Sequence, residues 1–205
     1  MKMIKRFVLG NLLTNCYLIN QKGKTILIDA GVDANKVVDY LIENKMKLDY
    51  IFITHCHYDH IGGLEYLVDN FPNVEVVVGK KEQKYLLNPD YNLSTMDDLY
   101  YTYTGKYITF EDFDYSNLDM EIRHISGHSL DGLCFYFPND KEIFVGDTLF
   151  RNTIGRSDLV DGNEYLLKQG IKEQLFSLED DIKVHPGHGF GTTIGKEKEN
   201  NPEFK

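Results

Sequence analysis

Three histidines and an aspartate fall within six consecutive residues of this sequence. They are His55, His57, Asp59 and His60. His55 and His57 are two residues apart, so on an extended chain their side chains point to the same side. Asp59 and His60 follow in the expected turn into a helix. Imidazole and carboxylate groups suit zinc, iron or manganese, so this spacing predicts a metal site.

One short segment cannot complete such a site, so we expect further ligands at distant turns. Three candidates share one pattern: each follows a glycine directly and lies at the end of a predicted strand. They are His128, Asp147 and His188. Glycine permits a sharp turn and a close approach of the backbone. Together with the first cluster, these residues supply enough ligands for two ions.

Cysteine is a second type of residue that can be reactive. The cysteines of this sequence indicate little chemistry. Three cysteines, Cys16, Cys56 and Cys134, make a poor disulfide framework for 205 residues, which fits a reducing cytoplasm. We expect all three to be small buried hydrophobic residues. Cys56 lies between two candidate ligands, but on an extended segment its side chain faces away from theirs.

Alternating strands and helices must position these residues. Apolar runs predict strands at residues 6–9, 16–20, 25–28, 50–54 and 74–78, and helical spacing predicts helices at 34–46 and 61–71. This order favours a layered α/β core. From residue 119 onward the pattern predicts antiparallel strands at 120–125, 133–137 and 143–145, a helix at 164–178, a short strand at 181–184 and a polar tail.

An irregular segment, residues 85–118, interrupts this order and contains seven of the 14 tyrosines. Tyrosine offers a flat apolar face with a polar tip. Two interpretations stay open: the rings pack over a thin part of the core, or they form a lid or wall beside an active site.

Length and charge exclude several classes of protein. The chain has 205 residues, which predicts a single domain over 1–205. Its longest apolar run has five residues, far fewer than the about 20 that cross a membrane. A net charge of −10 argues against nucleic-acid binding. The N-terminus does not resemble a signal peptide, so we expect a cytoplasmic protein.

The order of these motifs along the chain resembles that of the metallo-β-lactamase superfamily. Residues 146–150, 154–159 and 192–195 are similar to glyoxalase II-type enzymes, the hydroxyacylglutathione hydrolases. The resemblance implies a four-layer αββα sandwich of the metallo-β-lactamase type. The sequence resembles a short subgroup without the C-terminal helical domain that helps to hold glutathione in longer enzymes, so the thiol carrier stays open.

The resemblance also implies how the ligands are shared. A first ion would be held by His55, His57 and His128, a second by Asp59, His60 and His188, and Asp147 would bridge the two. His124 and His185 match no ligand position and are expected to be structural. Arg156 falls near the place where related enzymes bind the carboxylate of the thiol; the alternative is a surface ion pair.

These expectations combine into a metal-dependent hydrolase that acts on a small-molecule thioester. The nucleophile would be a hydroxide that bridges two divalent ions, because a metal lowers the pKa of bound water from about 15.7 to about 7. Asp59 and Asp147 would be the catalytic carboxylates. Zinc is the expected metal, with iron or manganese as alternatives. The sequence leaves the oligomeric state open.

The same residues leave other functions open. Persulfide dioxygenases share the superfamily and use a single iron held by two histidines and an aspartate. Other metal-dependent hydrolases are a lactonase, a phosphodiesterase, a nuclease or a β-lactamase. A metal-binding module without catalysis is disfavoured, because a structural site is usually closed by four ligands.

Overall fold

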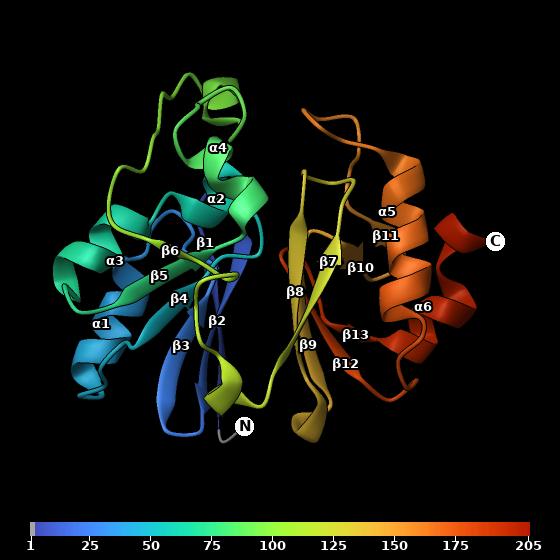
Figure 1. Cartoon of the computed structure of the whole chain (residues 1–205), viewed down its shortest axis with the longest axis horizontal. Coiled ribbons are helices and arrows are strands. Elements are labelled where there is room, and N and C mark those ends of the chain that lie inside the picture. The colour runs from blue at the N-terminus through green and yellow to red at the C-terminus, as the bar shows by residue number, and fades with distance from the viewer. Residues whose placement is uncertain (1–2) are drawn as a thin grey trace. The chain divides into compact units, whose positions relative to one another are not determined.

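The computed structural model describes residues 3–205 and contains two compact units (Figure 1). The first unit extends to Leu118 and the second from Asp119 to Lys205. The tyrosine-rich insertion, residues 85–118, therefore belongs to the first unit. That both units form one domain stays a prediction.

The first unit is built on a six-stranded mixed sheet with strands in sequence order. β1 to β3 are antiparallel, whereas β3 to β6 are parallel to one another. The parallel part matches the predicted alternation of strands and helices. The strands are β1 (Met3–Leu9), β2 (Thr14–Gln21), β3 (Lys24–Ile28), β4 (Tyr50–Phe52), β5 (Glu75–Val78) and β6 (Ile108–Thr109).

Helices α1 (Asn35–Glu43) and α3 (Leu64–Asn70) lie together on one face of this sheet (Figure 1). α1 buries Val37, Val38 and Leu41, three of the four apolar positions whose spacing predicts it, whereas the fourth, Ile42, is exposed. Its last turn ends earlier than predicted, at Glu43. Further along, the insertion starts within the short helix α4 (Gln83–Leu86) and contains a 3-10 turn, Ser94–Asp97.

The predicted helix at 61–71 is wrong in its first part. The structure has a single helical turn, α2 (Tyr58–Ile61), and then α3 from Leu64. Two glycines separate them, and the chain passes so near the turn after β3 that a Cβ at Gly63 would lie 2.3 Å from the carbonyl oxygen of Gly31. The ligands Asp59 and His60 thus lie in a helical turn of their own.

The second unit has a five-stranded sheet in the order β13-β12-β9-β8-β7. β7, β8 and β9 are antiparallel as predicted, while β12 is parallel to β9. The strands of this sheet are β7 (Glu121–Ile125), β8 (Gly132–Phe137), β9 (Glu142–Gly146), β12 (Lys183–Pro186) and β13 (Thr192–Thr193), and a separate hairpin pairs β10 (Leu149–Phe150) with β11 (Thr153–Ile154).

One face of this second sheet is covered by α5 (Glu164–Gly170) and a π-helical turn, Ile171–Leu175, which together replace the predicted helix at 164–178 (Figure 1). Leu167 of α5 packs into the apolar cluster of the sheet. The tail is polar in composition, but it also contains a helix that was not predicted, α6 (Ile194–Asn200). α6 forms because Ile194 is buried in the same cluster and Thr193 caps its first turn.

The tyrosines of the insertion divide into two groups. Tyr85 and Tyr103 are fully buried, so they pack in the core as one of the two interpretations expects, whereas Tyr100 is 79% exposed. Among residues 3–205, no helix is long and apolar enough to span a lipid bilayer.

Candidate metal centre

The first unit brings its four predicted ligands together just beyond the end of β4. His57 is the extended residue before α2, and Asp59 and His60 lie within that turn. His55 and His57 offer ligand atoms within 4.8 Å of each other, and the rings of His55 and His60 lie 4.1 Å apart. All three imidazoles are buried. This half of the predicted cluster is therefore assembled in the structure.

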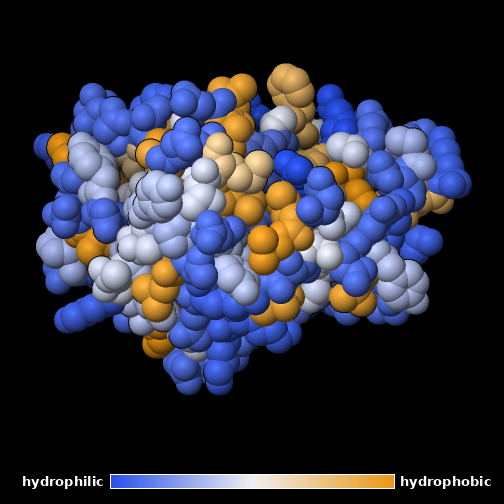
Figure 2. Space-filling model, turned by 90° about the horizontal axis from the view of Figure 1, so that it is seen from above, coloured by the Kyte–Doolittle hydropathy of each residue, from blue (hydrophilic) through white to orange (hydrophobic). Residues whose placement is uncertain are grey.

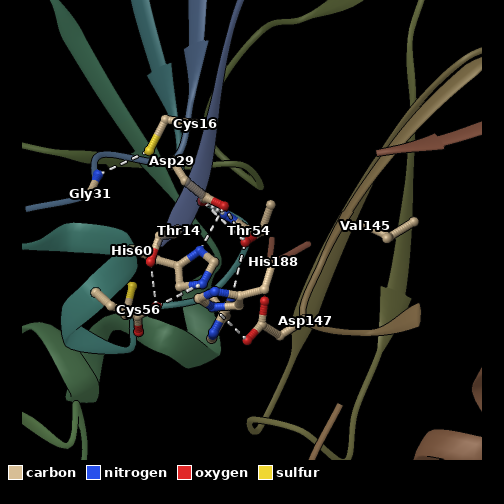
Figure 3. Close-up of polar contacts among 12 residues, drawn as sticks. Thr14, Cys16, Asp29, Gly31, Thr54, Cys56, His60, Val145, Asp147 and His188 are labelled. Carbon is tan, nitrogen blue, oxygen red and sulfur yellow. Dashed lines mark hydrogen bonds and ion pairs between the residues drawn. The ribbon is translucent and has the colours of Figure 1, made fainter. Parts of the chain in front are cut away.

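Asp29, the first residue after β3, is a buried carboxylate that sequence reasoning missed. Its Oδ2 lies 2.8 Å from Nδ1 of His60, and its Oδ1 accepts a hydrogen bond from the backbone N–H of Thr54 (Figure 3). The Thr54 hydroxyl donates to the same carboxylate and lies 3.1 Å from Nδ1 of His55. Because Nδ1 of His60 is engaged with a carboxylate, Nε2 is the nitrogen left for a metal ion.

Asp59 is held by Thr14, whose hydroxyl donates a 2.7 Å hydrogen bond to its Oδ2. The same oxygen lies 3.4 Å from Nε2 of His60. A charge-assisted hydrogen bond would be shorter, about 2.7–2.9 Å. Two ligand atoms at about 2.1 Å from one tetrahedral ion are about 3.4 Å apart, so this pair has the spacing of two ligands of a common ion.

The second unit places its three predicted ligands on turns that follow β7, β9 and β12. Oδ2 of Asp147 lies 3.4 Å from Nε2 of His188 (Figure 3). The same oxygen lies 3.7 Å from Nε2 of His128. The glycines before two of these residues have positive φ, +124° at Gly127 and +50° at Gly146. The predicted need for glycine at these two turns is confirmed.

His128 and Asp147 also depend on the turn at Gly155. Nδ1 of His128 donates a 2.8 Å hydrogen bond to the carbonyl oxygen of Arg156. This bond leaves Nε2, the nitrogen nearer Asp147, for a metal ion. A Cβ at Gly155 would lie only 1.8 Å from the carbonyl oxygen of Asp147, so only glycine fits there.

The remaining histidines and Arg156 have other partners. His124 is half exposed and lies 3.2 Å from Asp131. Nε2 of His185 lies 2.6 Å from Oε2 of Glu142. The guanidinium of Arg156 is exposed and forms two hydrogen bonds with Asp158, which hold the pKa of that carboxyl at about 2. The structure therefore shows the surface ion pair for Arg156, and substrate binding stays a prediction.

The thiol of Cys56 is fully buried, as predicted. Burial, followed by the charges of Glu82 and Asp29, raises its pKa well above the ordinary value, so it stays a neutral thiol. Its backbone N–H donates a 3.0 Å hydrogen bond to Oε2 of Glu82, which is also fully buried. Glu82 and Thr14 were missed because a single carboxylate or hydroxyl outside a motif gives no sequence signal.

The residues of both groups fit divalent metal ions. Each group combines imidazole nitrogens with a carboxylate, a donor set that suits zinc, iron and manganese. Each also contains a histidine whose other nitrogen is held by a carboxylate or a carbonyl, the arrangement that orients metal-bound imidazole. Their chemistry is that of metal-assisted hydrolysis or oxidation.

Known proteins are similar to this chain over nearly its whole length. It is 36% identical over 195 residues to a probable metallo-hydrolase of Streptococcus pyogenes, covering 92% of this chain and 84% of that protein. It is 32% identical over 199 residues to the hydroxyacylglutathione hydrolase GloC of Haemophilus influenzae, covering 92% and 91%.

Crystal structures show the same fold. The structure described as the BLEG-1 B3 metallo-beta-lactamase has a TM-score of 0.91 at 31% identity, covering 99% of this chain and 100% of that chain. A di-iron-bound form of TTHA1623 has a TM-score of 0.88 at 29% identity, covering 97% and 98%. The predicted αββα fold class is confirmed. Because the family model of the metallo-beta-lactamase superfamily matches residues 9–188, this chain belongs to that superfamily.

Proposed function

We propose that this chain is a thioester hydrolase with two divalent ions at its reactive centre. One observation carries the proposal: a carboxylate oxygen and an imidazole nitrogen lie 3.4 Å apart in each unit, in the pairs Asp59 with His60 and Asp147 with His188. The proposed ligands of the first ion are His55, His57 and His128, those of the second are Asp59, His60 and His188, and Asp147 belongs to both.

When bound, such ions lower the pKa of water and polarise a carbonyl group. The protein side chains would then orient the reaction. Thr14 fixes the Asp59 carboxylate through Oδ2, so that Asp59 can accept a proton from the attacking water. A thiolate leaves without being protonated, which means that no separate general acid is needed. This is why we favour a thioester over an ester or amide.

Arg156 is the proposed contact for a carboxylate of the departing thiol. Its present partner, Asp158, is exposed, and exposed ion pairs exchange partners readily because water screens them. A substrate carboxylate could therefore replace Asp158 on the guanidinium. The similarity to GloC supports glutathione as one thiol to test.

The test combines elemental analysis of the purified protein with a thioester-cleavage assay, using S-lactoylglutathione and esters of simpler thiols. We expect two metal ions per chain and metal-dependent release of thiol. Asp147→Ala should lose metal and turnover together, whereas His124→Gln should keep both. A fully active, metal-loaded Asp147→Ala variant would contradict the bridging role. One iron per chain with oxygen consumption on a persulfide would identify a dioxygenase instead.

A second candidate function is β-lactam hydrolysis, supported by the 31% identity to a protein described as a B3 metallo-beta-lactamase. Its leaving group is an amine nitrogen, which needs a proton that a thiolate does not. The same preparation should be assayed with nitrocefin. A kcat/KM for nitrocefin above that for every thioester would replace our first proposal with this one.

A further inference from the structure

A pocket of about 410 Å³ lies beside Asp59 in the first unit. We propose that it receives the acyl group of the substrate, and that this group is an apolar chain whose far end is uncharged or positively charged, not a carboxylate. This inference rests on the thioester-hydrolase function proposed above. It goes further by naming the chemical class of the acyl group.

Three parts of the first unit form most of the wall of this acyl pocket. The end of β1 and the turn after it supply residues 9–12, α2 supplies Tyr58 and Asp59, and the insertion supplies residues 97–99; Thr14 and Val32 complete the lining. Its volume is within the range of about 300–1,000 Å³ that is usual for small-molecule sites. A lactoyl group, which carries only a methyl and a hydroxyl, would fill a small part of it.

The rim of the acyl pocket is apolar and exposed. Leu12 is 57% exposed and Leu99 is 42% exposed, and both line the pocket. Their neighbours Leu13 and Met96 are exposed as well. Figure 2 shows small groups of hydrophobic residues among hydrophilic ones on the face that it views. An apolar chain that covers these leucines removes their surface from water, which favours binding.

The charge on the acyl pocket is negative. Asp97 and Asp98 line it, and among its lining residues in the described part of the chain there is no lysine or arginine. The insertion as a whole, residues 85–118, has six acidic residues and one lysine. A carboxylate on the acyl chain would be repelled.

The insertion is attached firmly to α2, so its carboxylates have a defined place. The backbone N–H of Tyr58 donates a 2.7 Å hydrogen bond to the carbonyl oxygen of Asn92. The Tyr101 hydroxyl donates to the carbonyl oxygen of Ile61, at the end of α2. The Asn92 side chain is buried and donates to the carbonyl oxygens of Tyr85 and Tyr101. The tyrosine-rich insertion thus forms a wall beside Asp59.

The experiment measures binding, so that it does not depend on turnover. The probes are three amides of N-acetylethylenediamine, in which nitrogen replaces the thioester sulfur: hexanoyl, 6-(trimethylammonio)hexanoyl and adipoyl. Their Kd values for the metal-loaded protein are measured by calorimetry at low and high salt. We expect the cationic probe to bind about tenfold more tightly than the adipoyl probe at low salt, with a smaller ratio at high salt.

Two substitutions at the wall test where this preference comes from. Asp97→Asn with Asp98→Asn should reduce the ratio to about twofold or less. Asn tolerates the left-handed backbone of Asp98, which has a φ of +56°, so the fold should be kept. The matched control, Asp90→Asn with Glu111→Gln, removes two exposed carboxylates of the same insertion that do not line the pocket, and it should keep the ratio.

Leu12→Ala tests the apolar contact without any change of charge. It should weaken hexanoyl binding about threefold or more, whereas Leu87→Ala, which removes an equally exposed leucine outside the pocket, should not. Adipoyl binding as tight as hexanoyl binding overturns the inference. The inference is also overturned if the charge preference remains after the Asp97 and Asp98 substitutions. It is overturned as well if Leu12→Ala and Leu87→Ala weaken hexanoyl binding equally.

Failure of the two proposals can be told apart. If no thioester is cleaved while the amides bind with the expected order of affinities, the proposed thioester hydrolysis is wrong and the proposed class of ligand for the acyl pocket is right. If thioesters are cleaved while adipoyl and hexanoyl amides bind equally, the hydrolase is right and the assignment of the acyl pocket is wrong.

Discussion

Oδ2 of Asp29 lies 2.8 Å from Nδ1 of His60, and both side chains are buried. Asp29 directly follows β3 and His60 lies in α2, so this contact ties the edge of the sheet to the helical turn that carries two proposed ligands. A carboxylate in this position fixes the orientation of the imidazole and makes its other nitrogen a better ligand. The first prediction follows from this contact.

Asp29→Asn should weaken metal binding about tenfold to a hundredfold. An asparagine has one acceptor oxygen in place of two. It cannot accept hydrogen bonds from Nδ1 of His60 and from the N–H and hydroxyl of Thr54 together. Competition with a chelator of known affinity measures the change. The control is Asp33→Asn, an exposed carboxylate in the following turn, which should leave the affinity unchanged. Equal affinities of both variants would show that Asp29 does not orient a metal ligand.

Gly155→Ala should destabilise the protein by about 3 kcal/mol or more and reduce its metal content. The added Cβ would lie 1.8 Å from the carbonyl oxygen of Asp147, so the turn that holds Asp147 and His128 must move. Gly23→Ala is the comparison, because Gly23 has a φ of +80° with open space around it, and should cost only about 1 kcal/mol. Urea unfolding and metal analysis measure both variants; a metal-loaded Gly155→Ala protein of normal stability would refute the argument.

Glu142 should contribute stability that depends on pH. Burial alone would raise its pKa, but hydrogen bonds from His185 and Lys183 lower it below the ordinary 4.5. A carboxyl with a lower pKa in the folded state stabilises the protein above its unfolded pKa, and this contribution is lost as pH falls through the folded pKa. Glu142→Gln should therefore cost about 1–3 kcal/mol at pH 7 and less below about pH 4.5.

Urea unfolding from pH 3 to pH 7 measures this difference between the parent protein and the Glu142→Gln variant. Glu179→Gln is the control, since Glu179 is exposed in its ion pair with Lys141 and should change the free energy of unfolding little at any pH. A constant difference between the parent and Glu142→Gln across the whole range would contradict the assigned ionisation.

Cys56→Ala should keep its full complement of metal and lose about 1 kcal/mol of stability. The thiol is buried and protonated, and the contact that positions this residue is the bond from its backbone N–H to Glu82, which alanine retains. Metal analysis beside thermal unfolding checks both parts. Loss of metal in this variant would make Cys56 a ligand and change the proposed donor set.

The local part of the candidate site could be predicted from the sequence because its ligands are close together in the chain. His55 and His57 alternate along one segment, and His128 and Asp147 each follow a glycine whose φ is positive in the structure. Periodicity and the conformational freedom of glycine are local properties, which one sequence displays.

The parts that were missed depend on pairing between distant segments. Asp29 reaches His60 because β3 and β4 are parallel neighbours, and the N–H of Asp29 donates to the carbonyl oxygen of Phe52 at the end of β4. Glu197 lies in the polar tail, yet its side chain is buried. Its carboxylate accepts hydrogen bonds from the side chain of Asn201 and from the backbone N–H of Asn152. No local pattern reveals either partner.

All three cysteines are unpaired and have no measurable exposure, with Cys16 and Cys56 in the first unit and Cys134 in the second. A maleimide can reach these sulfurs only after the surrounding structure opens. Mass spectrometry of the labelled peptides would therefore time the opening of each unit separately. Matching rates would mean that residues 1–205 unfold cooperatively, and a faster rate at Cys134 would reveal a second unit that opens by itself.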